Sequence, residues 1–298
     1  YWTENNILYN DNVNRVFGNI NVNYLATDWL SFTYRFGGDM WFKDVKDYFE
    51  IGSNQFPTGQ VTDYNQRNRD FNSDLIMTIN RQLGADLNFT LTAGHNAFQT
   101  SNSFTQAIAF GLTDLGFYNM NNSSDVRGFE GSSKKRTAAF FGDIAFDYKD
   151  MLFLNATGRQ EWSTSMPVDD NSFFYPSVSA AFEVTQLPGL QGNPILPYAK
   201  LRASWAQVAN DAAIYATDNY YFRAAPGDGW TNGLTYPFLG TNAFTLGGTI
   251  GNTDLKPETT NTFEVGIDLR FFQGRMGLDV GYFNYENNDL LISQPIAP

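Results

Sequence analysis

The sequence predicts an all-β protein, an antiparallel transmembrane β-barrel with about ten strands. Three observations support this prediction. Apolar and polar residues alternate along most of the chain, and helical periodicity is almost absent. The connections between alternating segments are short and long in turn. Aromatic residues make up 16% of the chain and charged residues only 17%, which suits a sheet that is wet on one face and apolar on the other.

The alternation is most regular at residues 86–94, where Leu87, Phe89 and Leu91 oppose Asn88 and Thr90. Several segments reach the ~9–11 residues that a tilted strand needs to cross a bilayer. The expected strands are 17–24, 29–37, 71–80, 86–94, 135–148, 151–162, 175–186, 199–208, 260–271 and 276–291.

The connections fall into two classes. Short ones are expected at 25–28, 81–85, 149–150 and 272–275, with 188–197 as a longer member of this class. Long ones are expected at 38–70, 95–134, 163–174 and 210–259. Regular alternation puts all long loops at one end of the strands, as in outer-membrane barrels. A soluble sandwich usually mixes its loop lengths.

Composition also excludes several classes of protein. The net charge of −12 argues against nucleic-acid binding, which uses basic patches. Because there is no cysteine, disulfides and zinc–thiolate sites are excluded. No run approaches the ~18 apolar residues of a membrane helix.

Few residues suggest catalysis or metal binding. His95 is the single histidine and is expected where a strand meets a long loop, so an ordinary loop-end imidazole is the simpler interpretation than a catalytic triad. Asp169 and Asp170, followed by Asn171, could offer oxygens to Ca²⁺, but a short acidic loop tip is the much simpler interpretation. No nucleotide motif is present. We therefore expect no catalytic residue, no metal and no cofactor.

Charged residues on the polar face of the strands are expected to line a wet lumen. Arg159 and Glu161 lie two positions apart on one predicted strand, and hence on one face. Arg202, Asp268 and Arg270 share the polar faces of two later strands. We expect these five residues to take part in a lumen network.

The long loop 210–259 is the best candidate for substrate contact. Tyr220, Tyr221, Trp230 and Tyr236 supply aromatic faces there, and Trp41 in the expected loop 38–70 is a weaker candidate. The alternative is that these aromatics form the core of their own loops or contact a partner that covers them.

Three stretches point to a known family. "RQEWSTSMPVDDNSFFYPS" (159–177), "KLRASWAQVAND" (200–211) and "NTDLKPETTNTFEVGIDLRFF" (252–272) resemble, in this order, the barrel of SusC/RagA-type TonB-dependent transporters of Bacteroidota outer membranes. In the third stretch, the polar tripeptide Lys256-Pro257-Glu258 immediately precedes a regular strand. Pro257 suits the start of a strand better than its interior.

The resemblance implies a barrel of about twenty-two strands with a plug inside it and a TonB box. Residues 1–298 would then be a partial barrel domain that lacks the plug and the C-terminal strands. It implies energised import of a glycan or an oligopeptide through a multi-pass barrel in the cell outer membrane, and not an enzyme. The implied partners are a SusD-like surface lipoprotein, TonB acting through the plug, and the outer-membrane lipid.

Two alternatives make different structural predictions. A self-contained barrel of about ten strands, such as an omptin-like protease or a structural porin, predicts that the strand near Phe17 pairs with the strand near Val280. A soluble sandwich adhesin predicts that Leu87, Phe89 and Leu91 face another sheet.

Overall fold

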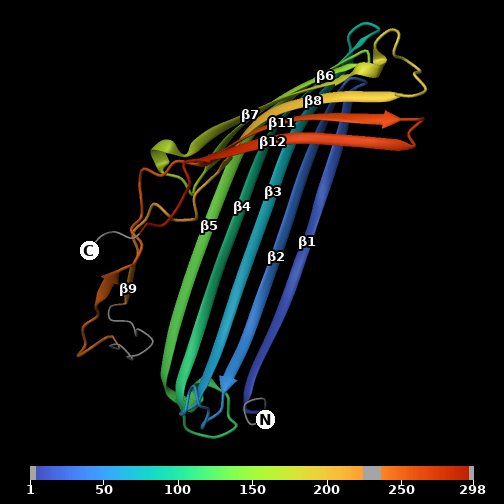
Figure 1. The fold of residues 1–298 in the computed structure, drawn as a ribbon. Coiled ribbons are helices and arrows are strands. Elements are labelled where there is room, and N and C mark those ends of the chain that lie inside the picture. The colour runs from blue at the N-terminus through green and yellow to red at the C-terminus, as the bar shows by residue number, and fades with distance from the viewer. Residues whose placement is uncertain (1–4, 224–235, 295–298) are drawn as a thin grey trace. The chain divides into compact units, whose positions relative to one another are not determined.

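A computed structural model describes residues 5–223 and 236–294 (Figure 1). The all-β prediction is confirmed, because these residues form a ten-stranded antiparallel sheet, a separate two-stranded ribbon and three 3₁₀ turns. The strands of the large sheet are β1 (Ile7–Thr27), β2 (Leu30–Phe49), β3 (Gln60–Gln82), β4 (Leu87–Leu112), β5 (Ser123–Tyr148), β6 (Leu152–Ser163), β7 (Ser172–Glu183), β8 (Tyr198–Asn210), β11 (Glu258–Phe271) and β12 (Met276–Asn288). The ribbon pairs β9 (Tyr221–Arg223) with β10 (Phe244–Leu246), and the turns are η1 (Met120–Asn122), η2 (Val168–Asp170) and η3 (Val184–Gln186).

The order of the large sheet is β1-β2-β3-β4-β5-β6-β7-β8-β11-β12. Each strand lies beside its predecessor in sequence, except that β11 follows β8 because the ribbon lies between them in the chain. β1, which contains Phe17, and β12, which contains Val280, are the two edges of this order. The pairing expected of a self-contained barrel is therefore contradicted within the described residues.

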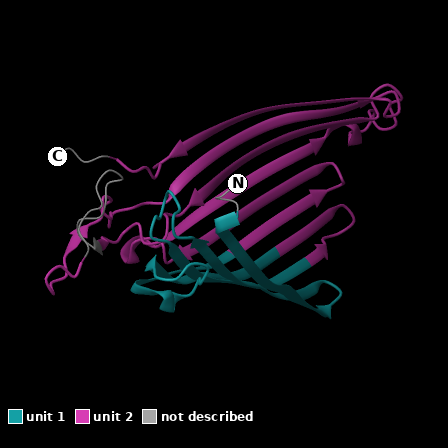
Figure 2. Cartoon of the chain, turned by 90° about the horizontal axis from the view of Figure 1, so that it is seen from below, with its two compact units in different colours: residues 1–79, 92–140 teal, residues 80–91, 141–298 magenta. Residues whose placement is uncertain are grey.

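The chain divides into two compact units, coloured in Figure 2 and treated separately below. Unit 1 comprises residues 1–79 and 92–140, which include β1, β2 and the adjoining parts of β3, β4 and β5. Unit 2 comprises residues 80–91 and 141–298, which include the remaining parts of these strands and all later elements.

The strands of unit 1 are longer than the sequence predicted. Most of the expected loops 38–70 and 95–134 is strand, and the actual connections are residues 50–59 and 113–122. Residues 37–70 include Gly37-Gly38 and, at 63–70, many Asp, Asn and Arg residues. However, β2 and β3 keep one register from Leu30↔Ile79 to Phe49↔Gln60. Polar side chains did not end the strands because each backbone still hydrogen-bonds to its neighbour.

Two residues assigned to loops consequently lie within strands. Trp41 lies in β2, opposite Arg15 on β1 and Asn68 on β3, and is not a loop residue. His95 lies inside β4, not at a loop, and its ring is 5.0 Å from that of Phe140.

Each strand has two different faces, because successive side chains point to opposite sides. On β2 and β3 the pairs Phe32↔Met77 and Tyr34↔Leu75 share what we call the apolar face. Arg35↔Asp74 and the residues two positions along share the polar face. The alternation predicted from the sequence is thus present in the sheet.

Two connections of unit 1, residues 50–59 after β2 and residues 113–122 after β4, form what we call the outer cap. A small core of Val61, Ala109 and Leu112 is buried beneath it, and Tyr48 stacks on Tyr118 with 3.5 Å between ring centroids. Burying these apolar groups stabilises the cap by roughly 25 cal/mol per Å² of apolar surface.

Asn122 is the polar centre of the outer cap and is only 4% exposed. Its Oδ1 accepts from the backbone N–H groups of Thr113 and Asp114, at 3.2 and 2.9 Å. Its Nδ2 donates to the carbonyls of Asp114 and Phe117, each at 2.7 Å. One side chain therefore satisfies four backbone groups of the loop.

Glu50 ties the two connections together. Its Oε2 accepts from the Tyr118 hydroxyl at 2.7 Å and from the Gly116 N–H at 2.9 Å, while Oε1 accepts from the Ile51 N–H at 2.8 Å. Burial opposes ionisation of the carboxyl, but these three hydrogen bonds outweigh it and lower the pKa of Glu50. Burial and the adjacent carboxylate raise the pKa of the Tyr118 hydroxyl, so this donor keeps its proton.

Replacing Asn122 by alanine should loosen the outer cap. Asn122→Ala removes side-chain hydrogen bonds from four backbone groups, of which the Thr113 N–H keeps the Asn122 carbonyl as a partner. Each of the other three hydrogen bonds contributes about 0.5–1.5 kcal/mol. We expect faster backbone hydrogen exchange across residues 113–122 in the purified full-length protein. The control is Asn121→Ala, which alters the exposed neighbouring side chain. Equal exchange in the two variants would contradict the assigned role.

The outer cap should also respond to acid. Because the folded pKa of Glu50 is below the 4.5 of a free glutamate, its contribution to stability is complete above that value and lost as pH falls through the lowered pKa. Exchange at Ile51 and Gly116, corrected for the intrinsic effect of pH, should rise in this acidic range. Glu50→Gln should remove the dependence on pH, whereas Glu130→Gln on the exposed surface should keep it. A dependence that persists in Glu50→Gln would refute this assignment.

Candidate functional site

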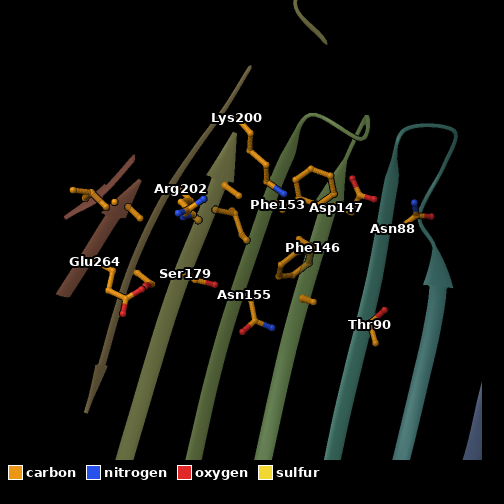
Figure 3. Close-up of a pocket in the computed structure, with 18 of the residues that line it drawn as sticks. Asn88, Thr90, Phe146, Asp147, Phe153, Asn155, Ser179, Lys200, Arg202 and Glu264 are labelled. Carbon is orange, nitrogen blue, oxygen red and sulfur yellow. The ribbon is translucent and has the colours of Figure 1, made fainter. Parts of the chain in front are cut away.

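The polar side chains of unit 2 gather around a hollow of ≈ 870 Å³, shown in Figure 3. Asn88 and Thr90 come from β4, Asp147 from β5, Asn155 from β6 and Ser179 from β7. Lys200 and Arg202 on β8 and Glu264 on β11 complete the polar wall. Alternation along neighbouring strands places these side chains together.

Arg202 crosses an entire strand within this hollow. Its Nη1 and Nη2 donate to the two carboxylate oxygens of Asp279 on β12, at 3.0 and 2.7 Å. The guanidinium passes over Gly266 on β11, where a Cβ atom would lie 2.5 Å from the Arg202 Nε. Glycine at this position therefore permits the ion pair between strands that are not neighbours.

Two further polar contacts lie in unit 2. The Lys200 ammonium lies 5.0 Å from the ring centroid of Phe153, and Asn155 donates to Asp143 at 2.7 Å. This arrangement gives a wet surface with locally balanced charge.

The five expected lumen residues form contacts in several places. Arg159 donates to Glu161 at 2.6 and 2.8 Å, and the Tyr175 hydroxyl donates to the same carboxylate at 2.8 Å. Arg202 contacts Asp279 as described, and Arg270 lies 3.3 Å from Asp268. Their participation in one lumen network stays a prediction.

A buried polar junction joins the first two of the stretches that carry the family resemblance. Ser163 and Ser165, each 2% exposed, both donate to Asp211 Oδ2, at 2.5 and 2.7 Å. Next to Asp211, Asn210 at the end of β8 pairs with Glu258 of the Lys-Pro-Glu tripeptide. We call Ser163, Ser165 and Asp211 the serine–aspartate junction. Sequence reasoning missed it; the signal was a pair of serines and an aspartate placed just beyond predicted strand ends.

The candidate substrate-contact residues lie in different parts of the chain. Tyr220 and Tyr221 lie at the start of the β9–β10 ribbon and are 44% and 68% exposed. Tyr236 is partly exposed, and Trp230 lies outside the described residues. Trp41 belongs to unit 1, on the polar face of β2. Substrate contact by these residues stays a prediction.

The two candidate calcium ligands lie at the surface of unit 2. Asp169 and Asp170 belong to the exposed turn η2. Across residues 5–223 and 236–294, no three His, Asp or Glu side chains are grouped as metal ligands. In the same part of the chain, no helix has the length and apolar character needed to cross a membrane.

Comparison with known proteins gives a consistent result. The family described as "TonB dependent receptor-like, beta-barrel" matches residues 1–298. TonB-dependent receptor P26 of Formosa agariphila is 29% identical over 231 residues, which are 76% of this chain and 22% of that protein. TonB-dependent receptor SusC of Bacteroides thetaiotaomicron is 26% identical over 175 residues, which are 55% of this chain and 16% of that protein.

Among solved structures, one titled as the structure of the RagAB peptide transporter matches with a TM-score of 0.87 and 14% identity. The match covers 100% of this chain and 32% of the other. At this identity it shows the fold alone. The chain thus spans 22% or less of the two curated relatives above and about a third of this structural neighbour.

The serine–aspartate junction makes a specific stability prediction. Asp211→Ala removes the shared acceptor of two buried hydroxyls. Because these hydroxyls also lie 2.8 Å from each other, one can still donate to the other, and one is left without an acceptor at a cost of about 1–3 kcal/mol. We expect the full-length protein in detergent micelles to unfold at a lower denaturant concentration. Asp218→Ala, in the same connection but exposed, is the control. If both variants unfold at the wild-type midpoint, the junction does not stabilise the barrel.

Proposed function

Because the chain belongs to the TonB-dependent receptor-like β-barrel family, we propose that the protein containing it imports a nutrient across the outer membrane with energy from TonB. Proteins of this family reside in the outer membrane. The resemblance to SusC/RagA-type transporters is confirmed at the level of the family. The observation that carries the proposal is the family match over residues 1–298, together with a sheet that has one apolar and one polar face.

The two faces have separate roles in this proposal. The apolar face contacts lipid, and the polar face, with its balanced charges around Arg202 and Asp279, lines the passage. A wet wall of paired charges lets polar cargo pass without a strong fixed site. β1 and β12 each leave one edge open, and open edges are not tolerated in lipid. We propose that further strands complete a barrel of about twenty-two strands.

The proposed cargo is a glycan or an oligopeptide. The exposed rings of Tyr220 and Tyr221 support this, since aromatic faces stack on sugar rings and on peptide side chains. One structural neighbour is titled as a peptide transporter, which agrees with the second cargo class. The proposal also includes a SusD-like surface lipoprotein at the outer end and TonB acting through a plug.

An enzymatic role has less support. The curated relatives are named as receptors and not as enzymes, and the polar hollow offers paired charges instead of an activated nucleophile.

The import proposal is tested by deleting the gene and measuring growth on individual glycans and peptides as sole nutrients. Growth on at least one of them should be lost, and the intact gene should restore it only in cells with functional TonB. If no nutrient depends on the gene, or if restored uptake does not require TonB, the proposed function is wrong.

Tyr221→Ala should weaken cargo binding without affecting folding. Loss of one aromatic contact is worth about 0.5–1.5 kcal/mol, or roughly two- to tenfold in affinity. The measurement is uptake of the cargo identified by the growth test, as a function of its concentration. Tyr24→Ala, an exposed tyrosine beside the β1–β2 turn, should leave uptake unchanged. Equal effects of the two changes would exclude Tyr221 as a cargo contact.

A further inference from the structure

A group of basic and hydroxyl side chains lies on the wall of unit 1, on its apolar face. On β3, Phe71 stacks on Phe36 of β2, 6.1 Å away, which places both rings on this face. Arg69 and Arg67 are the next two residues of β3 on the same face, because the register with β2 is continuous and pairs them with Met40 and Phe42. The apolar surface therefore gives way to two arginines towards the outer cap.

The strands β4 and β5 lie beside β3 (Figure 1), and their side chains change in the same way. The His95 ring lies beside Phe140. Further along the same two strands, the Arg136 Nε donates to Gln99 at 2.9 Å. Arg136 and Phe140 are four positions apart on β5 and so share a face. Ser132 and Lys134 continue this face of β5 beyond Arg136.

A pocket of ≈ 180 Å³ opens between these three strands. Six of its lining residues lie on the face just described, and we call them the basic rim cluster. They are Arg67, Arg69, Ser101, Ser103, Ser132 and Lys134. Three cations and three hydroxyls thus converge in a chain whose net charge is −12. The pocket lining contains no carboxylate, and Glu130 is two positions beyond Ser132 on the same face.

Arg67 and Arg69 differ from other arginines of the protein. Arg15, Arg127 and Arg159 each pair with a carboxylate. Arg67 and Arg69 make no ion pair and no side-chain hydrogen bond to another residue in the described part of the chain. Two exposed guanidinium groups on alternate residues of one strand repel each other unless an anion lies between them. Their forked donors match the oxygens of a phosphate group.

We propose that the basic rim cluster binds the phosphate of a lipid headgroup in the outer leaflet of the membrane. This inference rests on the membrane location in the proposed function. The long connections mark the outer end of the strands, and Arg69 is two residues, or about 7 Å, beyond Phe71. A lipid bound here lays its acyl chains on the apolar face near Phe71 and Leu75, while its phosphate reaches Arg67, Arg69 and the serine hydroxyls. This continuity favours a lipid over a free phosphate ion.

The test compares two variants of the full-length protein in neutral detergent micelles. Arg67→Gln/Arg69→Gln removes two charges from the cluster, and Lys149→Gln/Arg275→Gln removes two charges at the short turns of the opposite strand ends. The probes are a short-chain phosphatidic acid, the diacylglycerol with the same chains, and inorganic phosphate. Binding is measured by native mass spectrometry, and heat-dependent mobility on gels checks that each variant folds.

We expect phosphatidic acid to bind the wild type and the turn variant equally, and to bind the arginine variant about tenfold or more weakly. The diacylglycerol should show no such difference. Equal binding of phosphatidic acid to both variants would overturn the proposal. Inorganic phosphate that binds as tightly as the lipid would show a site for free anions instead. Because uptake is not the readout, loss of TonB-dependent import would refute the proposed function and leave this result intact.

Discussion

The structure depends on one constraint, which is that the backbone N–H and C=O groups of its strands must find partners inside the protein, as a bilayer would require. Antiparallel pairing from β1 to β12 meets this need for each inner strand. Pairing in turn imposes the alternation of side chains, since successive residues must point to opposite faces. The apolar face, the polar face and the hollow around Arg202 all follow from this pairing.

The same ladder extends beyond the apolar stretch in unit 1, where side chains no longer need to be apolar. There, pairing supports specific polar structures instead. Asn122 and Glu50 close the outer cap with buried hydrogen bonds. In unit 2, Asp211 just after β8 accepts from Ser163 at the end of β6 and from Ser165 in the turn that follows. These groups are costly to leave unpaired, so each fixes a loop that strand pairing alone would leave undetermined.

Charge is handled differently on the two faces. On the polar face, Arg202 reaches over Gly266 to Asp279, and Arg159 finds Glu161 on its own strand. In the proposed function, such pairs leave the passage wet and nearly neutral. On the other face, Arg67 and Arg69 have no carboxylate in their pocket. In the two proposals made above, this contrast separates a lining that polar cargo crosses from a surface that binds an external anion.

The sequence by itself determined the fold class, the number of strands in the large sheet, the positions of the short turns and the two faces, because period-two alternation is a local property. Only the tertiary structure decided where strands β2 to β5 end, since cross-strand pairing overrides polar composition at Trp41 and His95. It also decided which charges meet. Arg159 and Glu161 are neighbours on one strand, and their spacing suggested the pair. Arg202 and Asp279 are separated by a whole strand, and Asp211 meets two serines far along the chain. Such contacts depend on strand register and on the order in which strands pair, which no local pattern encodes.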